Sequence, residues 1–133
     1  MALTKISPSM QKETKTITVN IDGGGSVIST GILKGADITI PYAMTITQWQ
    51  LTADQSGSIT IDVWKDTYAN FPPTVADTIT STDKPKLIST IKNRNTNITL
   101  WNTTVNAGDI LRFNVDSVST CTSVTLTITG TKI

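Results

Sequence analysis

The sequence contains no histidine, one cysteine and one glutamate among its 133 residues. The absence of histidine removes the commonest general base, the usual serine-hydrolase triad and most transition-metal sites. Because Cys121 stands alone, the chain forms no internal disulfide and builds no cysteine zinc cage. Stability must therefore come from packing, hydrogen bonding or association, and we interpret Cys121 as a small side chain in or near a strand.

Charge is also scarce. Charged residues make up 16% of the chain, the net charge is +1, and the 11 Lys and Arg residues do not gather into one stripe. Binding to nucleic-acid phosphates needs such a stripe, so we expect no nucleic-acid partner. No run approaches the ~20 apolar residues of a membrane span, and the N-terminus lacks the apolar run of a signal peptide. We therefore expect no membrane association, and synthesis in the cytoplasm without a signal peptide.

Threonine, by contrast, supplies about a fifth of the chain, and its branched side chain suits a pleated sheet. Segments such as Thr16–Ile21 and Val124–Ile128 alternate apolar and polar residues, which is typical of half-buried strands. Turn signals separate about eight to nine such segments. The pattern predicts an all-β fold, an antiparallel, jelly-roll-like β-sandwich, with an immunoglobulin-like sandwich as the alternative. We expect residues 1–14 to form an N-terminal arm and residues 15–133 a single β-sandwich domain.

Two segments with clear alternation, Met44–Leu51 and Ser58–Trp64, flank the turn-like sequence Asp54–Gly57. This arrangement predicts a β-hairpin. The buried face of the first segment is left open by the sequence. One face holds Met44, Ile46, Gln48 and Gln50, and the other holds Thr45, Thr47, Trp49 and Leu51.

Carboxylates are the remaining candidates for chemistry. Five aspartates on or near the predicted loops are candidates for a catalytic pair or for calcium ligands: Asp54, Asp62, Asp66, Asp77 and Asp83. Nothing in their spacing selects a pair, and no calcium-loop spacing is present. The run Gly23–Gly25 is not followed by a helix pattern, so we interpret it as a turn and not as a phosphate loop. We therefore expect no catalysis, no cofactor and no bound metal.

Potential recognition groups concentrate between Trp64 and Pro73. The candidate contacts with a partner or a glycan are Trp64, Lys65, Asp66, Tyr68, Asn70 and Phe71. Aromatic faces stack on sugars or anchor protein interfaces, and neighbouring polar groups orient the partner. The sequence favours a plainer interpretation, in which Trp64 packs the end of the sandwich and the loop aromatics pin a long connection over the core. That connection, between residues 65 and 85, is also predicted to contain one short helical turn near residues 75–79.

Four segments resemble a β-sandwich module found in virion proteins of tailed bacteriophages. They are Ile17–Gly25, Ala53–Ile59, Asp62–Pro73 and Ala107–Asp116. The resemblance covers roughly residues 15–130, and its most specific part is Trp64-Lys65-Asp66-Thr67-Tyr68. Proteins with this module include tail-fibre-like proteins and small decoration or accessory structural proteins.

The resemblance implies a structural component of a bacteriophage virion. Such a chain would be a small accessory protein on the capsid exterior, as decoration or cement, or would be attached to the tail or neck, and it would act by protein–protein packing. Its partners would be other virion proteins, and homo-oligomers, trimers above all, are common among such proteins. The family offers no catalytic residues. The alternative function is a carbohydrate-binding module that recognises host surface glycans.

Overall fold

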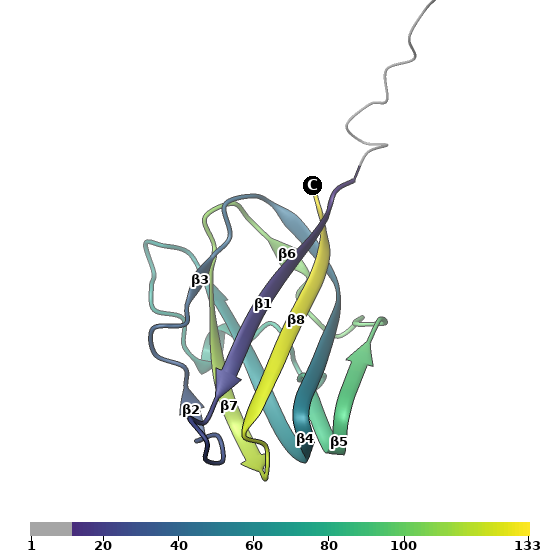
Figure 1. Cartoon of the computed structure of the whole chain (residues 1–133). Coiled ribbons are helices and arrows are strands. Elements are labelled where there is room, and N and C mark those ends of the chain that lie inside the picture. Colours follow the sequence, from purple (N-terminus) through teal and green to yellow (C-terminus); the bar gives the residue numbers. More distant parts are fainter. Residues whose placement is uncertain (1–11) are drawn as a thin grey trace, which may run out of the picture.

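The computed structural model describes residues 12–133, which form an antiparallel eight-stranded sheet that curls into a sandwich (Figure 1). The strands are β1 (Thr14–Asp22), β2 (Gly31–Ile32), β3 (Ile38–Thr39), β4 (Met44–Asp66), β5 (Lys86–Asn95), β6 (Thr104–Val105), β7 (Ile110–Ser119) and β8 (Ser123–Lys132). One 3₁₀ turn, η1 (Val75–Asp77), confirms the predicted short helical turn. The predicted all-β, jelly-roll-like sandwich is likewise confirmed.

The long strand β4 belongs to both layers of the sandwich. Residues 44–53 pair with β8, and residues 58–66 pair with β7. Beyond β8, β1 completes the first layer, and Figure 1 shows these two strands running side by side. Beyond β7, β2 and β3 complete the second layer. Strand β5 pairs with both halves of β4, so β4 and β5 bend together from one layer into the other.

The core lies between these layers. Because side chains alternate between the two faces of a strand, every second residue of β1, β7 and β8 points inward. Nine inward apolar residues of these three strands are at most 7% exposed: Ile17, Val19, Ile21, Leu111, Phe113, Val115, Val124, Leu126 and Ile128. Burying an aliphatic or aromatic side chain of this size contributes about 1.5–3 kcal/mol. The alternation read from the sequence therefore accounts for most of the core.

The predicted hairpin between Met44–Leu51 and Ser58–Trp64 is wrong, because both segments belong to β4. Gly57 lies where the pairing of β4 changes layer. A Cβ atom at this position would lie 2.6 Å from Oγ1 of Thr120 and 2.7 Å from Sγ of Cys121. The glycine therefore permits a close approach between β4 and the connection from β7 to β8, and it does not form a chain reversal.

A β-bulge decides which face of the Met44–Leu51 segment is buried. The register of β4 against β8 shifts between Ile46 and Gln48, which leaves Thr47 as an extra, exposed residue. The bulge reverses the alternation. The buried side chains are Met44 and Ile46 before it, and Trp49 and Leu51 after it. Each of the two faces that the sequence left open is thus buried over half of its length.

The predicted N-terminal arm comprises residues 1–14. Its residues 1–11 lie outside the described residues. Thr14 begins β1 and pairs with Thr131 of β8. The Glu13 carbonyl accepts a hydrogen bond of 2.8 Å from the backbone amide of Lys132. Among the described residues, no helix is long and apolar enough to cross a membrane.

Candidate interaction site

The connection between β4 and β5, residues 67–85, covers part of the outer surface of the second layer. Because Val63 points into the core, its neighbours Asp62 and Trp64 point outward from β4. Both are nevertheless buried, at 1% and 6% exposure. The Ile79 amide donates to the Val63 carbonyl at 3.0 Å, and Thr78 forms a bridge with Trp64. The connection therefore docks on β4 directly above these two outward side chains.

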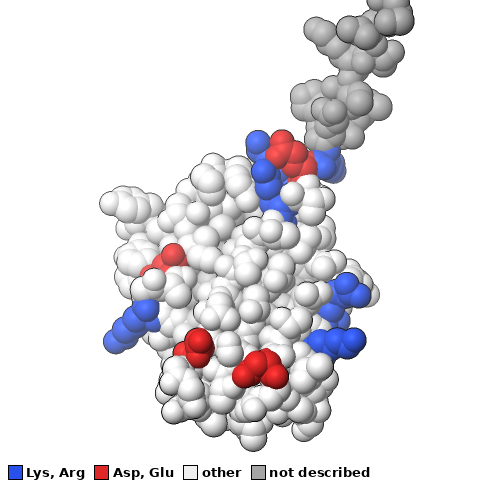
Figure 2. Space-filling view, viewed as in Figure 1, with Lys and Arg blue, Asp and Glu red and all other residues white. Residues whose placement is uncertain are grey.

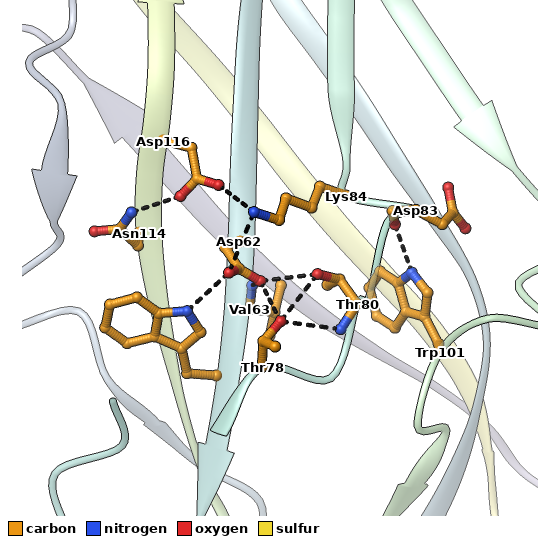
Figure 3. Close-up of polar contacts among 10 residues, drawn as sticks. Asp62, Val63, Thr78, Thr80, Asp83, Lys84, Trp101, Asn114 and Asp116 are labelled. Atoms are coloured by element: carbon orange, nitrogen blue, oxygen red, sulfur yellow. Dashed lines mark hydrogen bonds and ion pairs between the residues drawn. The ribbon is translucent and has the colours of Figure 1, made fainter. Parts of the chain in front are cut away.

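Asp62 accepts four hydrogen bonds, two from its own strand and two from the connection, which Figure 3 draws together with their neighbours. From its own strand, the Val63 amide donates at 2.9 Å and the Trp64 indole at 3.0 Å. From the connection, the hydroxyls of Thr78 and Thr80 donate at 2.6 and 2.8 Å. We call Asp62, Trp64, Thr78 and Thr80 the Asp62 anchor. It fixes the middle of the connection to the last part of β4.

Lys84 ties the end of the same connection to β7. Its ammonium lies 2.6 Å from the Asp116 carboxylate and 3.7 Å from that of Asp62 (Figure 3). The hydrogen bond to Asp116, with the nearby charges of both carboxylates, raises the pKa of Lys84. The Asn114 side-chain amide donates to the other oxygen of Asp116 at 2.6 Å. The middle and the end of the covering segment are thus held by polar contacts.

The anchor keeps Asp62 ionised. Burial by itself raises the pKa of this carboxyl, since the charged form loses its water. The hydrogen bonds from Thr78, Trp64 and Thr80, together with the positive charge of Lys84, outweigh burial and lower the pKa below its ordinary value. A carboxylate that already accepts four hydrogen bonds has little basicity left for proton abstraction. Its role in this arrangement is to anchor the connection.

The segment from Asp66 to Phe71, where β4 passes into the connection, faces solvent, and we call it the tip of the connection. Asp66 closes a turn there, since its carboxylate accepts hydrogen bonds from the next backbone amide at 2.7 Å and from the Asn70 side chain at 3.4 Å. Tyr68 is 83% exposed, Val75 66% and Phe71 44%. The connection therefore displays three large apolar or aromatic side chains on a segment that is held from below.

Arg112 of β7 steadies Phe71. The centre of its guanidinium lies 5.2 Å from the Phe71 ring centroid, a cation–π distance. The same guanidinium donates two hydrogen bonds to Asp37, at 2.8 and 2.9 Å. A forked contact of this kind restricts the orientation of the guanidinium plane. Phe71 is thus supported by the body of the protein although its ring is half exposed.

The six predicted contact residues occupy two different environments. Trp64 is buried, and the Lys65 ammonium donates to the Thr104 carbonyl and lies 3.9 Å from Asp109. The other four residues lie at the tip of the connection: Asp66, Tyr68, Asn70 and Phe71. Contact with a partner or a glycan stays a prediction for all six.

Sequence reasoning did not find the anchor. It placed Asp62 in the alternating segment Ser58–Trp64 but also counted this residue among the aspartates on or near loops. Asp62 lies inside β4, between the buried residues Ile61 and Val63. The sequence carries only an indirect signal. Trp64 lies on the same outward face, and a large apolar side chain there favours a covered face, whereas a carboxylate by itself is ordinarily exposed to solvent.

The other aspartates considered for chemistry stabilise local structure. The carboxylate of Asp77 accepts from the Thr74 amide at 2.8 Å, where η1 begins. Asp54 accepts from the Thr122 hydroxyl and Asp83 from the Asn95 side chain, both at 2.8 Å. Within residues 12–133, no three or more histidine, cysteine, aspartate or glutamate side chains gather closely enough to hold a metal ion.

Comparison with known proteins finds no matching family model and no matching curated protein. Two solved structures show a distant likeness. One is described as the capsid asymmetric unit of cyanophage Pam1, with 11% identity, a TM-score of 0.37, and coverage of 99% of this chain and 92% of that chain. The other is the structure of infectious bursal disease virus, Gx strain, with 15% identity and a TM-score of 0.29. It matches over 99% of this chain, which spans only 44% of that one. At TM-scores this low, the likeness supports no conclusion about the role of this chain.

Proposed function

We propose that this chain is a structural component of a bacteriophage virion. It is a small accessory protein on the capsid exterior, or attached to the tail or neck, and it packs against other virion proteins. The observation that carries this proposal is the display of Tyr68, Phe71 and Val75 on a connection fixed by the Asp62 anchor. Exposed aromatic and apolar side chains are the residues that anchor protein interfaces.

The way in which the connection is held favours binding through these side chains. The free energy of binding becomes less favourable when a mobile loop must be ordered on association, and a loop that is already fixed avoids this cost. Here η1 carries a capping box between Thr74 and Asp77, and Arg112 supports Phe71. The exposed residues are thus presented in a defined arrangement before any partner arrives.

The resemblance to phage virion modules supports the same proposal from the sequence. Its most specific stretch, Trp64 to Tyr68, includes a member of the anchor and leads to the tip of the connection. The most specific part of the resemblance therefore includes residues that build and present this surface. The proposal takes the proteins that pack against it to be other components of the particle.

The proposal is tested by measuring incorporation into particles. Mass spectrometry of purified particles should find the wild-type chain at a fixed copy number. The double variant Tyr68→Ser/Val75→Ser should be folded yet lost from the particles, since its apolar anchors are gone. The matched control, Val27→Ser/Ile88→Ser, removes exposed apolar side chains elsewhere and should be retained.

Particles without the wild-type chain would overturn the proposal, as would full incorporation of the Tyr68→Ser/Val75→Ser variant. A glycan array provides the second arm. Binding of the wild-type chain to host glycans that is lost in Tyr68→Ser would favour the carbohydrate-binding alternative instead.

A further inference from the structure

The register of the first layer builds a polar grid on its outer face. One row across four strands consists of Thr18, Thr127, Gln50 and Arg94. The next row, two residues along, consists of Asn20, Thr125, Thr52 and Lys92. All eight side chains are at least partly exposed, because the residues between them in sequence on β1, β8 and β4 point into the core. Each row runs from hydroxyl and amide groups to a cation on β5.

The cations of β5 are not neutralised. The strand carries Lys86, Lys92 and Arg94 and contains no acidic residue. Among the residues that the structure describes, none of these three takes part in an ion pair, whereas Lys15, Lys65, Lys84 and Arg112 each do. Figure 2 shows the middle of this face without charged side chains and basic groups along the margin where β5 lies. Acidic groups lie at the lower end of the same face, so the unpaired positive charge of β5 borders the uncharged middle of the face and not a wholly neutral surface.

Arg94 and Lys92 line an open hollow of about 550 Å³ together with Gln50, Thr52 and Asn93. The two basic residues are two positions apart on one face of β5, so their Cα atoms are about 6.6 Å apart. The guanidinium and ammonium donate only, while the neighbouring amides and hydroxyl both donate and accept. No carboxylate lines the hollow. The lining thus offers two anion contacts beside groups that exchange hydrogen bonds with hydroxyls.

We propose that this hollow binds an acidic polysaccharide. Its carboxylate or sulfate groups contact Arg94 and Lys92. Its sugar hydroxyls contact Gln50, Thr52 and the threonines farther along the same two rows. Charge-assisted hydrogen bonds to oxyanions are the strongest contacts that this surface can make. The proposal is independent of the virion role, because it uses none of the residues of the β4–β5 connection.

A polysaccharide fits the hollow better than an acidic protein segment does. Protein interfaces depend on buried apolar or aromatic anchors, and the two rows contain no apolar side chain. An acidic peptide added as a strand would need a regular edge on β5. That edge is kinked, since Ser89 has a φ of 48° and the pairing with β4 is interrupted between Thr52 and Gly57. A hydroxyl-rich anionic chain needs neither feature.

Calorimetric titration of the purified chain with oligogalacturonate at physiological salt tests the proposal. Lys92→Gln/Arg94→Gln should weaken binding by about tenfold or more, because both anion contacts are lost. The control Lys34→Gln/Lys132→Gln makes the same change in net charge at two other exposed lysines and should change binding by less than about twofold. Gln50→Val/Thr52→Val should weaken binding of the oligosaccharide but not of inorganic sulfate. Thermal melting verifies that each variant folds.

Equal weakening by the two charge-removing variants would overturn the proposal, since binding would then follow net charge alone. Poly-glutamate binding as tightly as oligogalacturonate would overturn the assignment to a carbohydrate. Undetectable binding of the wild-type chain to both oligogalacturonate and dextran sulfate would also overturn it. Neutral dextran should not bind, because it has no group for Arg94 and Lys92.

Discussion

The indole of Trp64 donates a hydrogen bond of 3.0 Å to the carboxylate of Asp62, two residues earlier on the same outward face of β4. Residues at this separation on a strand lie about 6.6 Å apart, which the length of the indole spans. Both side chains point outward from β4 but are buried, because the connection covers them. The connection adds two hydrogen bonds to the same carboxylate, from the hydroxyls of Thr78 and Thr80. This arrangement holds the connection that displays Tyr68 and Phe71.

Asp62→Asn should lower the free energy of unfolding by about 2–4 kcal/mol, since the amide has one acceptor oxygen where the carboxylate has two and turns an N–H group toward other donors. Urea unfolding measures the change. The control is Asp22→Asn at the exposed end of β1, where an amide oxygen can still accept from the Gly24 amide. It should cost less than about 0.5 kcal/mol. Equal costs for the two variants would show that the anchor contributes nothing beyond an exposed carboxylate.

The pH dependence of stability should carry the signature of Asp62. Its pKa is lowered in the folded state, so the unfolded chain binds more protons over the interval between the two pKa values, and stability rises with pH there. The contribution is present above the ordinary value of 3.8 and is lost as pH falls through the folded pKa. Lys84, whose pKa is raised, loses its contribution only at alkaline pH and does not affect this interval.

Urea midpoints between pH 7 and pH 2.5 test this prediction. The stability difference between the wild-type chain and Asp62→Asn should shrink as the pH falls below about 4. Glu13 also has a lowered pKa, but it is present in both proteins and therefore cancels in the difference. A difference that stays constant down to the lowest pH would contradict the assignment.

The strands could be predicted where one face is buried along the whole element. In β1 and β8 the inward residues follow strict alternation, so the sequence alone locates them. In β4 two features depend on other strands. Thr47 is an extra residue only because of its pairing with β8, and Gly57 is needed because Thr120 and Cys121 lie beside it. The turn-like residues at 54–57 fit either a reversal of the chain or a close approach of another segment, so the sequence alone does not distinguish the two.

The exposed part of the candidate site was visible in the sequence, and its support was not. Tyr68 and Phe71 stand out because aromatic residues are few, 5% of the chain. The Asp62 anchor joins residues 16 and 18 positions apart, and it exists only once the connection has docked on β4. Periodicity describes one strand at a time, so it cannot reveal which outward positions a later segment covers.

Gly57→Ala should destabilise the chain by about 1–3 kcal/mol, because the added Cβ would lie 2.6–2.9 Å from atoms of the β7–β8 connection, the Ser119 carbonyl oxygen being backbone. The control is Ser56→Ala, at the preceding exposed residue, which should be nearly neutral. Thermal unfolding followed by circular dichroism measures both. If Gly57→Ala melts with the wild-type chain, the close approach does not constrain the fold.

Two buried tryptophans provide a matched comparison. Trp101 donates its indole N–H to the Asp83 carbonyl at 2.7 Å, whereas the indole nitrogen of Trp49 has no partner among the described residues. Replacement by Phe removes the same volume at each site and so leaves a similar cavity. Trp101→Phe also leaves a carbonyl without its donor, while Trp49→Phe removes a buried donor that is not satisfied.

Trp101→Phe should therefore cost about 1 kcal/mol or more beyond the cost of Trp49→Phe in the free energy of unfolding, measured by urea denaturation with equal m-values. Both side chains are nearly fully buried, at 6% and 2% exposure, so the comparison isolates the hydrogen bond from the loss of apolar contact. A larger cost for Trp49→Phe would mean that packing around Trp49, at the point where the bulge reverses the buried face of β4, outweighs the satisfied hydrogen bond of Trp101.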